Sequence, residues 1–347
     1  MSLSLFPEYE RQERQLTLPE DPTIVVSISG GKDSVAALLA TLETYGSQHV
    51  LAHHQVILED WPGTPEYCQE VCDVLGVPLY LSQAHYYGRE CSHCTKRYLS
   101  SDPEPHCRAC GCRDAKLIMM VTSILDLVEW RRMWPSPAVR FCTSYCKRDV
   151  FNAWARHNRH LLGPTPVVVL GERWRESPGR SRLPVLRRRP SLEWMLEWRP
   201  ILDYRRIDAF RASRAYSIEP HYCYKAQGMT DEDLYEVDRE GGPRMSCVMC
   251  FYKPAHELHA SARVEVAQPI FARAVTVERT IGHTLKAGQS LESMIPSWSR
   301  GESHEQSDES PADVACKASI SRQPESVPLL EHNQARRQDK STSGRET

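Results

Sequence analysis

Short apolar runs alternate with stretches of helical spacing along the first two-thirds of the chain. Strands are predicted where β-branched and apolar residues gather, at residues 23–28, 49–58, 77–81 and 166–170. Helices are predicted where apolar residues recur every three or four positions, at residues 35–45, 65–75, 115–133, 145–157 and 207–215. Because strands that alternate with helices form parallel sheets with right-handed crossovers, we expect an α/β fold with a doubly wound, mostly parallel sheet.

The turn after the first predicted strand is the most informative polar segment. Residues 29–34 read Ser-Gly-Gly-Lys-Asp-Ser, and a predicted helix follows directly. Glycines let a backbone approach a ligand closely, and the N-terminus of a helix favours negative charge. Lys32 adds a positive charge, and the Ser29 and Ser34 hydroxyls can donate to phosphate oxygens. We therefore predict an anion site; the alternative is a strand–turn–helix corner that binds nothing.

Polar residues also follow two other predicted strands. Asp60 comes after the second strand, and Gly171, Glu172 and Arg173 come after the strand at 166–170. Since the carboxyl ends of parallel strands meet at one edge of a sheet, these residues and the turn predict a single ligand site. Two interpretations are open for Asp60: a residue near the ligand, or an ordinary turn acid.

Composition restricts the location and the partners of the chain. A net charge of −2 and a pI of about 6.7 argue against a global attraction to nucleic acid, although local patches can still bind it. No apolar stretch reaches the length that spans a bilayer, and the N-terminus lacks the apolar core of a signal peptide. We therefore expect a cytoplasmic protein without a membrane partner. Thirteen cysteines in that compartment favour metal sites or reactive thiols over disulfides, with Cys68 and Cys72 as core residues.

Five of the cysteines lie in a polar insert at residues 85–114. Cys91, Cys94, Cys107 and Cys110 form two Cys-x₂-Cys pairs at the spacing of a zinc ribbon, and Cys112 is additional. A polar insert of this kind needs a metal to become ordered, so we predict a closed structural Zn²⁺ site. The alternative is a flexible loop with reduced cysteines.

Composition also sets the expected boundaries. Residues 1–20 are expected to be an N-terminal extension, and 21–300 one domain that carries the insert. Residues 301–347 lack aromatic residues and are rich in Ser, Glu, Gln, Arg and Lys, which predicts a disordered tail with Cys316 as an incidental cysteine.

The turn at 29–34 resembles the SGGxDS loop of the PP-loop ATP pyrophosphatases, an adenine nucleotide alpha hydrolase-like superfamily that includes the phosphoadenosine phosphosulfate (PAPS) reductase family. Further segments resemble segments of that family in the same order. They are Arg140-Phe141-Cys142-Thr143 with Lys147, Gly171-Glu172-Arg173 with Glu176, Ser177 and Arg180, residues 198–204, His221-Tyr222, and residues 244–250. The resemblance covers roughly residues 20–295 apart from the insert, and it implies the fold of that superfamily.

The resemblance implies that an adenine nucleotide, ATP or PAPS, binds at the sheet edge as substrate. Nucleotide-binding roles are implied for Ser29, Gly30, Gly31, Lys32, Asp33, Ser34, Asp60, Gly171, Arg173, Glu176, Ser177 and Arg180, and catalytic roles for Lys32, Asp33 and Arg173. Asp33 either orients Lys32, coordinates Mg²⁺ or caps the following helix. Trp61 either stacks on adenine or packs in the core.

A second set of cysteines falls in segments that the family brings near the site. It consists of Cys142, Cys146, Cys247 and Cys250. Four such thiolates suit Zn²⁺ or a [4Fe–4S] cluster, and the alternative is a set of buried thiols. Adenylylsulfate reductases carry such a cluster on an adjacent Cys-Cys pair plus Cys-x₂-Cys, whereas the first pair here is Cys-x₃-Cys.

Three functions fit these features. The first is reduction of PAPS or a related sulfonucleotide with a thioredoxin-like partner, although the family's Glu-Cys-Gly-Leu-His segment is absent from this sequence. The second is ATP pyrophosphatase-type thiolation of tRNA or of the DNA backbone, with a sulfur-donor protein. The third is a non-catalytic module that binds nucleotide or nucleic acid. Arg187, Arg188 and Arg189 are either a solvated basic turn or part of a nucleic-acid track.

Overall fold

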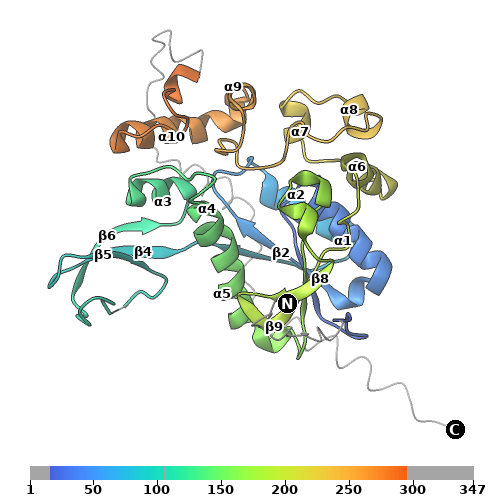
Figure 1. Ribbon diagram of the computed structural model, residues 1–347, viewed down its shortest axis with the longest axis horizontal. Helices are drawn as coiled ribbons and strands as arrows, with labels where there is room; N and C mark the ends of the chain where they lie inside the picture. The colour runs from blue at the N-terminus through green and yellow to red at the C-terminus, as the bar shows by residue number, and fades with distance from the viewer. Residues whose placement is uncertain (1–15, 105, 295–347) are drawn as a thin grey trace, which may run out of the picture. The chain divides into compact units, whose positions relative to one another are not determined.

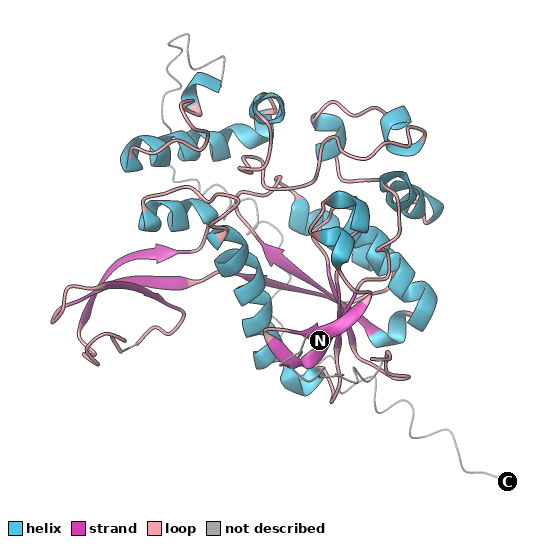
Figure 2. Ribbon diagram, viewed as in Figure 1, coloured by secondary structure: helices cyan, strands magenta, loops and turns pink. Residues whose placement is uncertain are grey.

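The computed structural model describes residues 16–104 and 106–294, which are arranged around a six-stranded sheet (Figures 1 and 2). The predicted tail at 301–347, Cys316 and most of the predicted N-terminal extension lie outside the described residues. The strand order is β3 (Leu79–Gln83), β2 (Val50–Val56), β1 (Ile24–Ser27), β7 (Val167–Val169), β9 (Leu192–Trp198) and β8 (Leu186–Arg189). β8 pairs antiparallel with β9, and the other pairings are parallel, which confirms the mostly parallel sheet.

Helices cover both faces of this sheet, and alternate side chains of β1 pack against helices on opposite faces. Ile24 and Val26 pack with α1 (Lys32–Tyr45), α2 (Thr64–Val74) and α6 (Arg206–Ala215). Val25 faces the opposite side and packs with α5 (Asp149–His157). Cys68 and Cys72 are fully buried on α2, so their prediction as core residues is confirmed. Alternating β1 side chains therefore enter two separate cores, as expected for a doubly wound sheet.

The helix predicted at 115–133 is wrong in its first half. Residues Ala115–Val121 form β6, which pairs antiparallel with β4 (Tyr86–Cys91), and β4 also pairs with β5 (Arg97–Ser100). The helix α3 begins only at Ile124, because Ser123 and Asp126 form a reciprocal capping box there. Periodicity alone does not distinguish a short apolar strand from a helix, and the pairing partner of β6 lies in the insert.

The C-terminal helices and α3 (Ile124–Arg131) enclose a further core, which is centred on residues such as Trp61, Leu125 and Phe271. These helices are α7 (Cys223–Ala226), α8 (Asp231–Tyr235), α9 (Ala255–Ala262) and α10 (Gln268–Ile281). A short helix, α4 (Phe141–Thr143), precedes α5 and is joined to it by a π-helical turn at Ser144–Arg148. Among the described residues, no helix combines the length and apolar character needed to cross a membrane.

Candidate functional site

The candidate site lies where the strand order reverses direction, between β1 and β7. β1 has β2 on one side and β7 on the other, so the turns that follow β1 and β7 are neighbours at the carboxyl edge of the sheet. Crevices at such switch points are the usual ligand sites of open α/β sheets. The structure thus brings the glycine turn and Arg173 together, as the chain pattern predicted.

The glycine turn leads directly into α1. Gly30 has a positive φ of 76°, which glycine adopts without strain, and Gly31 is the N-cap of α1 without a side-chain cap. Ser34 closes the turn: its hydroxyl donates to the Gly31 carbonyl (2.8 Å) and accepts from the Ser29 N–H (3.1 Å). The N-terminus of a buried 14-residue helix and the glycine backbone therefore meet at one point, which is an electrostatic setting for an anion.

Asp33 joins the two cations of the site. Its Oδ2 lies 2.8 Å from Lys32 Nζ, and its Oδ1 lies 2.7 Å from Arg173 Nε. Burial would raise the pKa of Asp33, but Lys32 and Arg173 hold that pKa below its usual value. Asp33 is the second residue of α1, after the N-cap, and in this structure its carboxylate orients Lys32 and Arg173.

Gly171 allows this contact between the β7 turn and α1. A Cβ atom at position 171 would lie 2.5 Å from the Asp33 carbonyl oxygen and 2.8 Å from the Ser34 nitrogen. These are backbone atoms within the first turn of α1, so a side chain at 171 would force the two elements apart. The glycine is needed for packing, which then places Arg173 beside Asp33.

Glu176 and Arg180 surround Arg173 on its own turn. Glu176 Oε2 accepts from the Arg173 N–H (3.1 Å) and forms an ion pair with Arg180. Arg180 also approaches Glu172, at 3.5 Å. Ser177 is exposed, and its hydroxyl accepts from the Arg180 N–H at 3.3 Å. The structure brings these predicted residues together near the site, but their charged groups mainly form ion pairs with one another.

Two groups at the site were not predicted from the sequence. Glu240 places its carboxylate 3.1 Å from Arg173 Nη1, and Glu240 Oε1 also accepts from the Arg206 N–H at the start of α6 (3.0 Å). Tyr224, fully buried, accepts a hydrogen bond from the Lys32 N–H at 2.9 Å. Glu240 precedes the pair Gly241-Gly242, which marks a turn in the sequence, but no pattern connects either residue to the glycine turn.

Asp60 lies among buried polar groups on the other side of the turn. Its charge acts on His54, His221, Lys147 and Cys247. His54 donates from Nδ1 to the Ile28 carbonyl (2.9 Å), while its buried Nε2 has no partner among the described residues.

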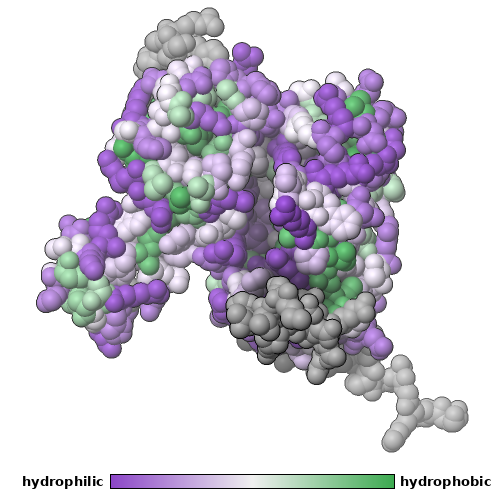
Figure 3. Space-filling model, in the orientation of Figure 1, coloured by the Kyte–Doolittle hydropathy of each residue, from purple (hydrophilic) through white to green (hydrophobic). Residues whose placement is uncertain are grey.

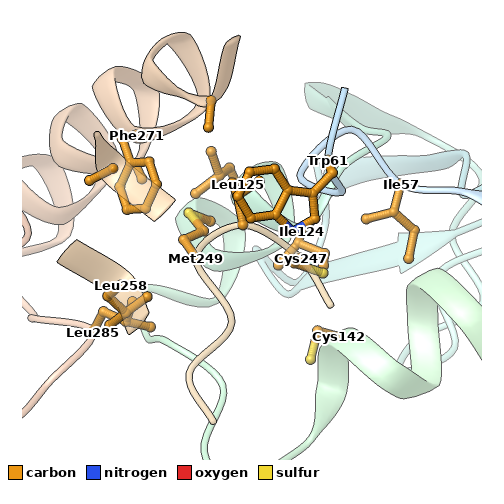
Figure 4. Close-up of a cluster of buried hydrophobic side chains, with 14 of the residues drawn as sticks. Ile57, Trp61, Ile124, Leu125, Cys142, Cys247, Met249, Leu258, Phe271 and Leu285 are labelled. Atoms are coloured by element: carbon orange, nitrogen blue, oxygen red, sulfur yellow. The ribbon is translucent and has the colours of Figure 1, made fainter. Parts of the chain in front are cut away.

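Trp61 is 1% exposed and packs in the core, so it is not placed to stack on a ligand. Figure 4 shows its ring beside Cys247 and, on a neighbouring helix, Cys142. Among the described residues, no three sulfur atoms of the set Cys142, Cys146, Cys247 and Cys250 lie within 4.8 Å of one another. Burial raises the pKa of Cys142, Cys146 and Cys247, so these thiols are protonated as they stand.

This spacing does not fit a single Zn²⁺, whose sulfur ligands lie about 3.8 Å apart because Zn–S bonds are about 2.3 Å long. It leaves two interpretations of the set: buried thiols, and ligands of a wider iron–sulfur cluster. Lys147 lies in the same neighbourhood, near Asp60 and three of the four sulfurs.

The four cysteines of the insert do gather at one point. All four sulfur atoms of Cys91, Cys94, Cys107 and Cys110 lie within 4.8 Å of one another, with Cys91–Cys110 and Cys94–Cys107 both at 3.6 Å. This spacing matches tetrahedral coordination of Zn²⁺ by sulfur. The group can hold a metal ion, which confirms the predicted clustering, while the identity of the metal stays a prediction.

The two Cys-x₂-Cys pairs adopt matching turns. The N–H of Thr95 donates to the Cys91 carbonyl (2.9 Å), and the N–H of Gly111 donates to the Cys107 carbonyl (2.7 Å). Both donors stand four residues after the first cysteine of their pair, and both have positive φ. Backbone N–H groups of Cys94 and His93 lower the pKa of Cys91 to about 6, which favours the thiolate form that binds metals.

The chain has low sequence identity to the known proteins that it resembles. No family model matches the chain. An uncharacterized 37.8 kDa protein from the gpa 5′ region of Escherichia phage 186 is 25% identical in an alignment of 259 residues that covers 67% of this chain and 68% of that protein. A crystal structure of PAPS reductase from Candida auris in complex with phosphate superposes with a TM-score of 0.36 and 12% identity, over 60% of this chain and 80% of the reductase. Membership of the PAPS reductase family therefore stays a prediction from the sequence motifs.

Proposed function

We propose that the chain binds an adenine nucleotide, PAPS or ATP, at the glycine turn and carries out sulfur-related chemistry on it. The observation that carries this proposal is the convergence of four anion-binding elements at the β1–β7 switch point. These are the Gly30–Gly31 backbone, the N-terminus of α1, the Lys32 ammonium and the Arg173 guanidinium.

In this proposal each group has a separate role. The glycine backbone and the N-terminus of α1 hold the phosphates, with Ser29, Ser34, Gly171, Glu176, Ser177 and Arg180 shaping the site around them. Lys32 and Arg173 offset the negative charge that develops on the leaving phosphate or sulfate group. Asp33 orients both cations, and together with Asp60 it offers the carboxylate oxygens that Mg²⁺ prefers.

Two reactions fit this site. A sulfonucleotide reductase releases sulfite and adenosine 3′,5′-bisphosphate, and an ATP pyrophosphatase that thiolates tRNA or DNA releases pyrophosphate. The abundance of cysteines near the site favours sulfur chemistry of either kind, with a sulfur-donor or thioredoxin-like protein as partner. The lack of a Glu-Cys-Gly-Leu-His segment weighs against the thioredoxin-dependent reductase. A non-catalytic nucleotide- or nucleic-acid-binding module is the alternative. A cytoplasmic location is part of the proposal.

We propose metal sites at two separate sets of four cysteines. The Cys91, Cys94, Cys107 and Cys110 group would hold a structural Zn²⁺ that staples the insert. The set Cys142, Cys146, Cys247 and Cys250 would hold an iron–sulfur cluster, which supplies electron transfer or sulfur-transfer chemistry when bound. An anaerobic preparation with a visible spectrum and metal analysis distinguishes a cluster from buried thiols.

Lys32→Ala tests the function. Calorimetry with ATP and with PAPS should show binding of one of them by the wild-type chain. The Lys32→Ala variant should lose at least about 100-fold in turnover, because the leaving group loses its cation. Lys225→Ala, at an exposed lysine paired with Asp231, is the matched control and should change little. Unchanged turnover in Lys32→Ala would remove the glycine turn from the mechanism, and no heat with either nucleotide would contradict the proposed function.

A further inference from the structure

An open cleft of about 540 Å³, lined mostly by polar and charged residues, lies between α5 and the β8–β9 hairpin, apart from the glycine turn. Arg148, Asp149, Asn152 and Arg156 line it from the α5 side, and Arg187 and Ser191 line it from the hairpin. Figure 3 shows that hydrophilic residues cover much of the face of the molecule that is in view. None of these residues has a role in the function proposed above.

The α5 wall of the cleft presents its arginines in a row. Positions 148, 152 and 156 are four residues apart and therefore share one face of the helix. Arg148 and Arg156 are both exposed, and their Cα atoms are about 12 Å apart along the helix axis at 1.5 Å per residue. Arg148 Nε lies 3.2 Å from Asp149 Oδ1, and Arg156 donates to the Ser191 carbonyl at 3.4 Å. Each guanidinium group has five N–H donors, so both keep donors for an anion.

Behind the hairpin wall, three arginines share one buried carboxylate. Glu197 lies 2.5 Å from Arg187, 2.9 Å from Arg189 and 2.8 Å from Arg199. Arg199 also pairs with Glu172, at 2.6 Å. The cleft and this cluster together hold five arginines and three carboxylates: Arg148, Arg156, Arg187, Arg189 and Arg199 against Asp149, Glu172 and Glu197.

This arrangement corrects one of the two interpretations of residues 187–189, that of a solvated basic turn. They belong to β8, and Arg189 is buried against Asn152 and Glu197. Because buried Arg189 is close to Arg187 and Arg148, positive charge is concentrated on one side of α5. A concentration of like charges is unfavourable unless an anion offsets it.

The chemistry of the lining selects the kind of anion. Guanidinium groups bind phosphate oxygens through two parallel N–H donors, and the wall carries three of them. Among the residues that the structure describes, no aromatic side chain lines the cleft, so these residues offer no stacking platform for a base. Two arginines whose Cα atoms are about 12 Å apart along α5 suit two separate phosphates of one strand better than a single phosphate.

We propose that this cleft binds the phosphates of a nucleic-acid backbone without reading its sequence. Free inorganic phosphate shares the same chemistry and is the alternative source of the anion. The proposal does not depend on the reaction at the glycine turn, because nucleic-acid binding is measured without turnover.

The test measures fluorescence anisotropy of labelled probes against the full chain over a range of salt concentrations. The probes are single-stranded DNA, single-stranded RNA and duplex DNA, each of about 20 nucleotides or base pairs. The double variant Arg148→Ala/Arg156→Ala should bind at least about tenfold more weakly, and its slope of log affinity against log salt should fall by about two. Arg214→Ala, at an exposed arginine of α6 outside the cleft, is the matched control and should behave as wild type.

Both substituted side chains are exposed, so circular dichroism and thermal unfolding should match the wild type. Equal affinity and equal salt slope in the double variant would overturn the proposal. Failure of the wild-type chain to bind any probe at about 50 mM salt would overturn it as well. Displacement of the probe by millimolar inorganic phosphate at matched ionic strength would assign the cleft to free phosphate instead.

Discussion

At the scale of single residues, the buried Arg173 guanidinium pairs with two carboxylates from different parts of the chain. Its side chain is 3% exposed, with Asp33 on one nitrogen and Glu240 on another. Asp33 belongs to the rigid first turn of α1, whereas Glu240 belongs to a glycine-containing loop. Glu240 thus occupies the guanidinium face that an incoming phosphate or sulfate would use, and an anionic ligand has to compete with it.

Glu240→Gln should therefore strengthen anion binding. The substitution keeps the size of the side chain but removes the charge that competes for Arg173. Glu240 is about one-third exposed, so the effect expected is that of a partly solvated ion pair, about two- to fivefold in Kd. Calorimetric titration with the nucleotide that the wild-type chain binds measures this change.

Glu236→Gln is the matched control, because Glu236 is an exposed carboxylate of the same chain segment that pairs only loosely with Arg214. Weaker binding by Glu240→Gln than by wild type would mean that Glu240 holds Arg173 in its productive orientation rather than competing with the ligand.

At the scale of elements, the insert is a small three-stranded sheet whose two Cys-x₂-Cys turns converge at one end. β4 lies between β5 and β6, and the loops that carry Cys94, Cys107 and Cys110 are polar and largely exposed. A three-stranded sheet of this size buries little apolar surface, so it needs a staple to be stable. The cysteine cluster lies where the two turns meet, so a metal ion bound there would fix both turns.

Purified protein should accordingly contain about one equivalent of Zn²⁺ in this group. Cys94→Ser should lose that equivalent, and hydrogen exchange of the β4–β6 amides should accelerate because the turns are no longer fixed. Metal analysis together with hydrogen-exchange mass spectrometry provides the measurement. Cys112→Ser is the control, since Cys112 lies in the insert but outside the cluster, and it should keep the metal. If the wild-type protein contains no metal and its β4–β6 amides still exchange slowly, the predicted zinc site is wrong.

At the scale of the whole molecule, the face of the sheet under α5 contains a buried histidine. His53 receives a hydrogen bond from Gln55 at Nδ1 (2.6 Å) and donates from Nε2 to Ser82 (2.8 Å), which defines a neutral ring. The ring also packs 4.3 Å from that of Trp154. Burial, and then the neighbouring His54, lower the pKa of His53 to about 3.

This depressed pKa makes stability depend on acidity. The unfolded chain binds a proton at His53 below a pH of about 6.5, whereas the folded chain does so only near pH 3. The contribution of neutral His53 to the free energy of unfolding is therefore fully present above about pH 6.5 and is lost as the pH falls toward 3. His53 alone should lower the free energy of unfolding by about 2 kcal/mol between pH 7 and pH 5.

Urea unfolding at the two pH values measures this slope. His53→Gln should flatten it, while His160→Gln, at an exposed histidine, should leave it as in wild type. An identical slope in wild type and His53→Gln would show that His53 does not cause the acid sensitivity.

Features that depend on neighbouring residues along the chain could be predicted from the sequence. Apolar runs and helical spacing located β1, β2, β3 and β7, and the helices α1, α2, α5 and α6, because period and turn residues are local properties. The Ser29–Ser34 turn and the cysteine spacing of the insert were evident for the same reason. The mostly parallel sheet followed from the alternation of these elements.

Tertiary structure alone decided the features that depend on residues distant in sequence. β6 is a strand because β4 pairs with it, and Gly171 is needed because α1 passes close to it. Glu240 reaches Arg173 across 67 positions of the chain, and the arginine cleft arises only where α5 packs beside β8 and β9. Local patterns carry no information about such contacts, because long-range packing is a property of the whole chain and not of any segment.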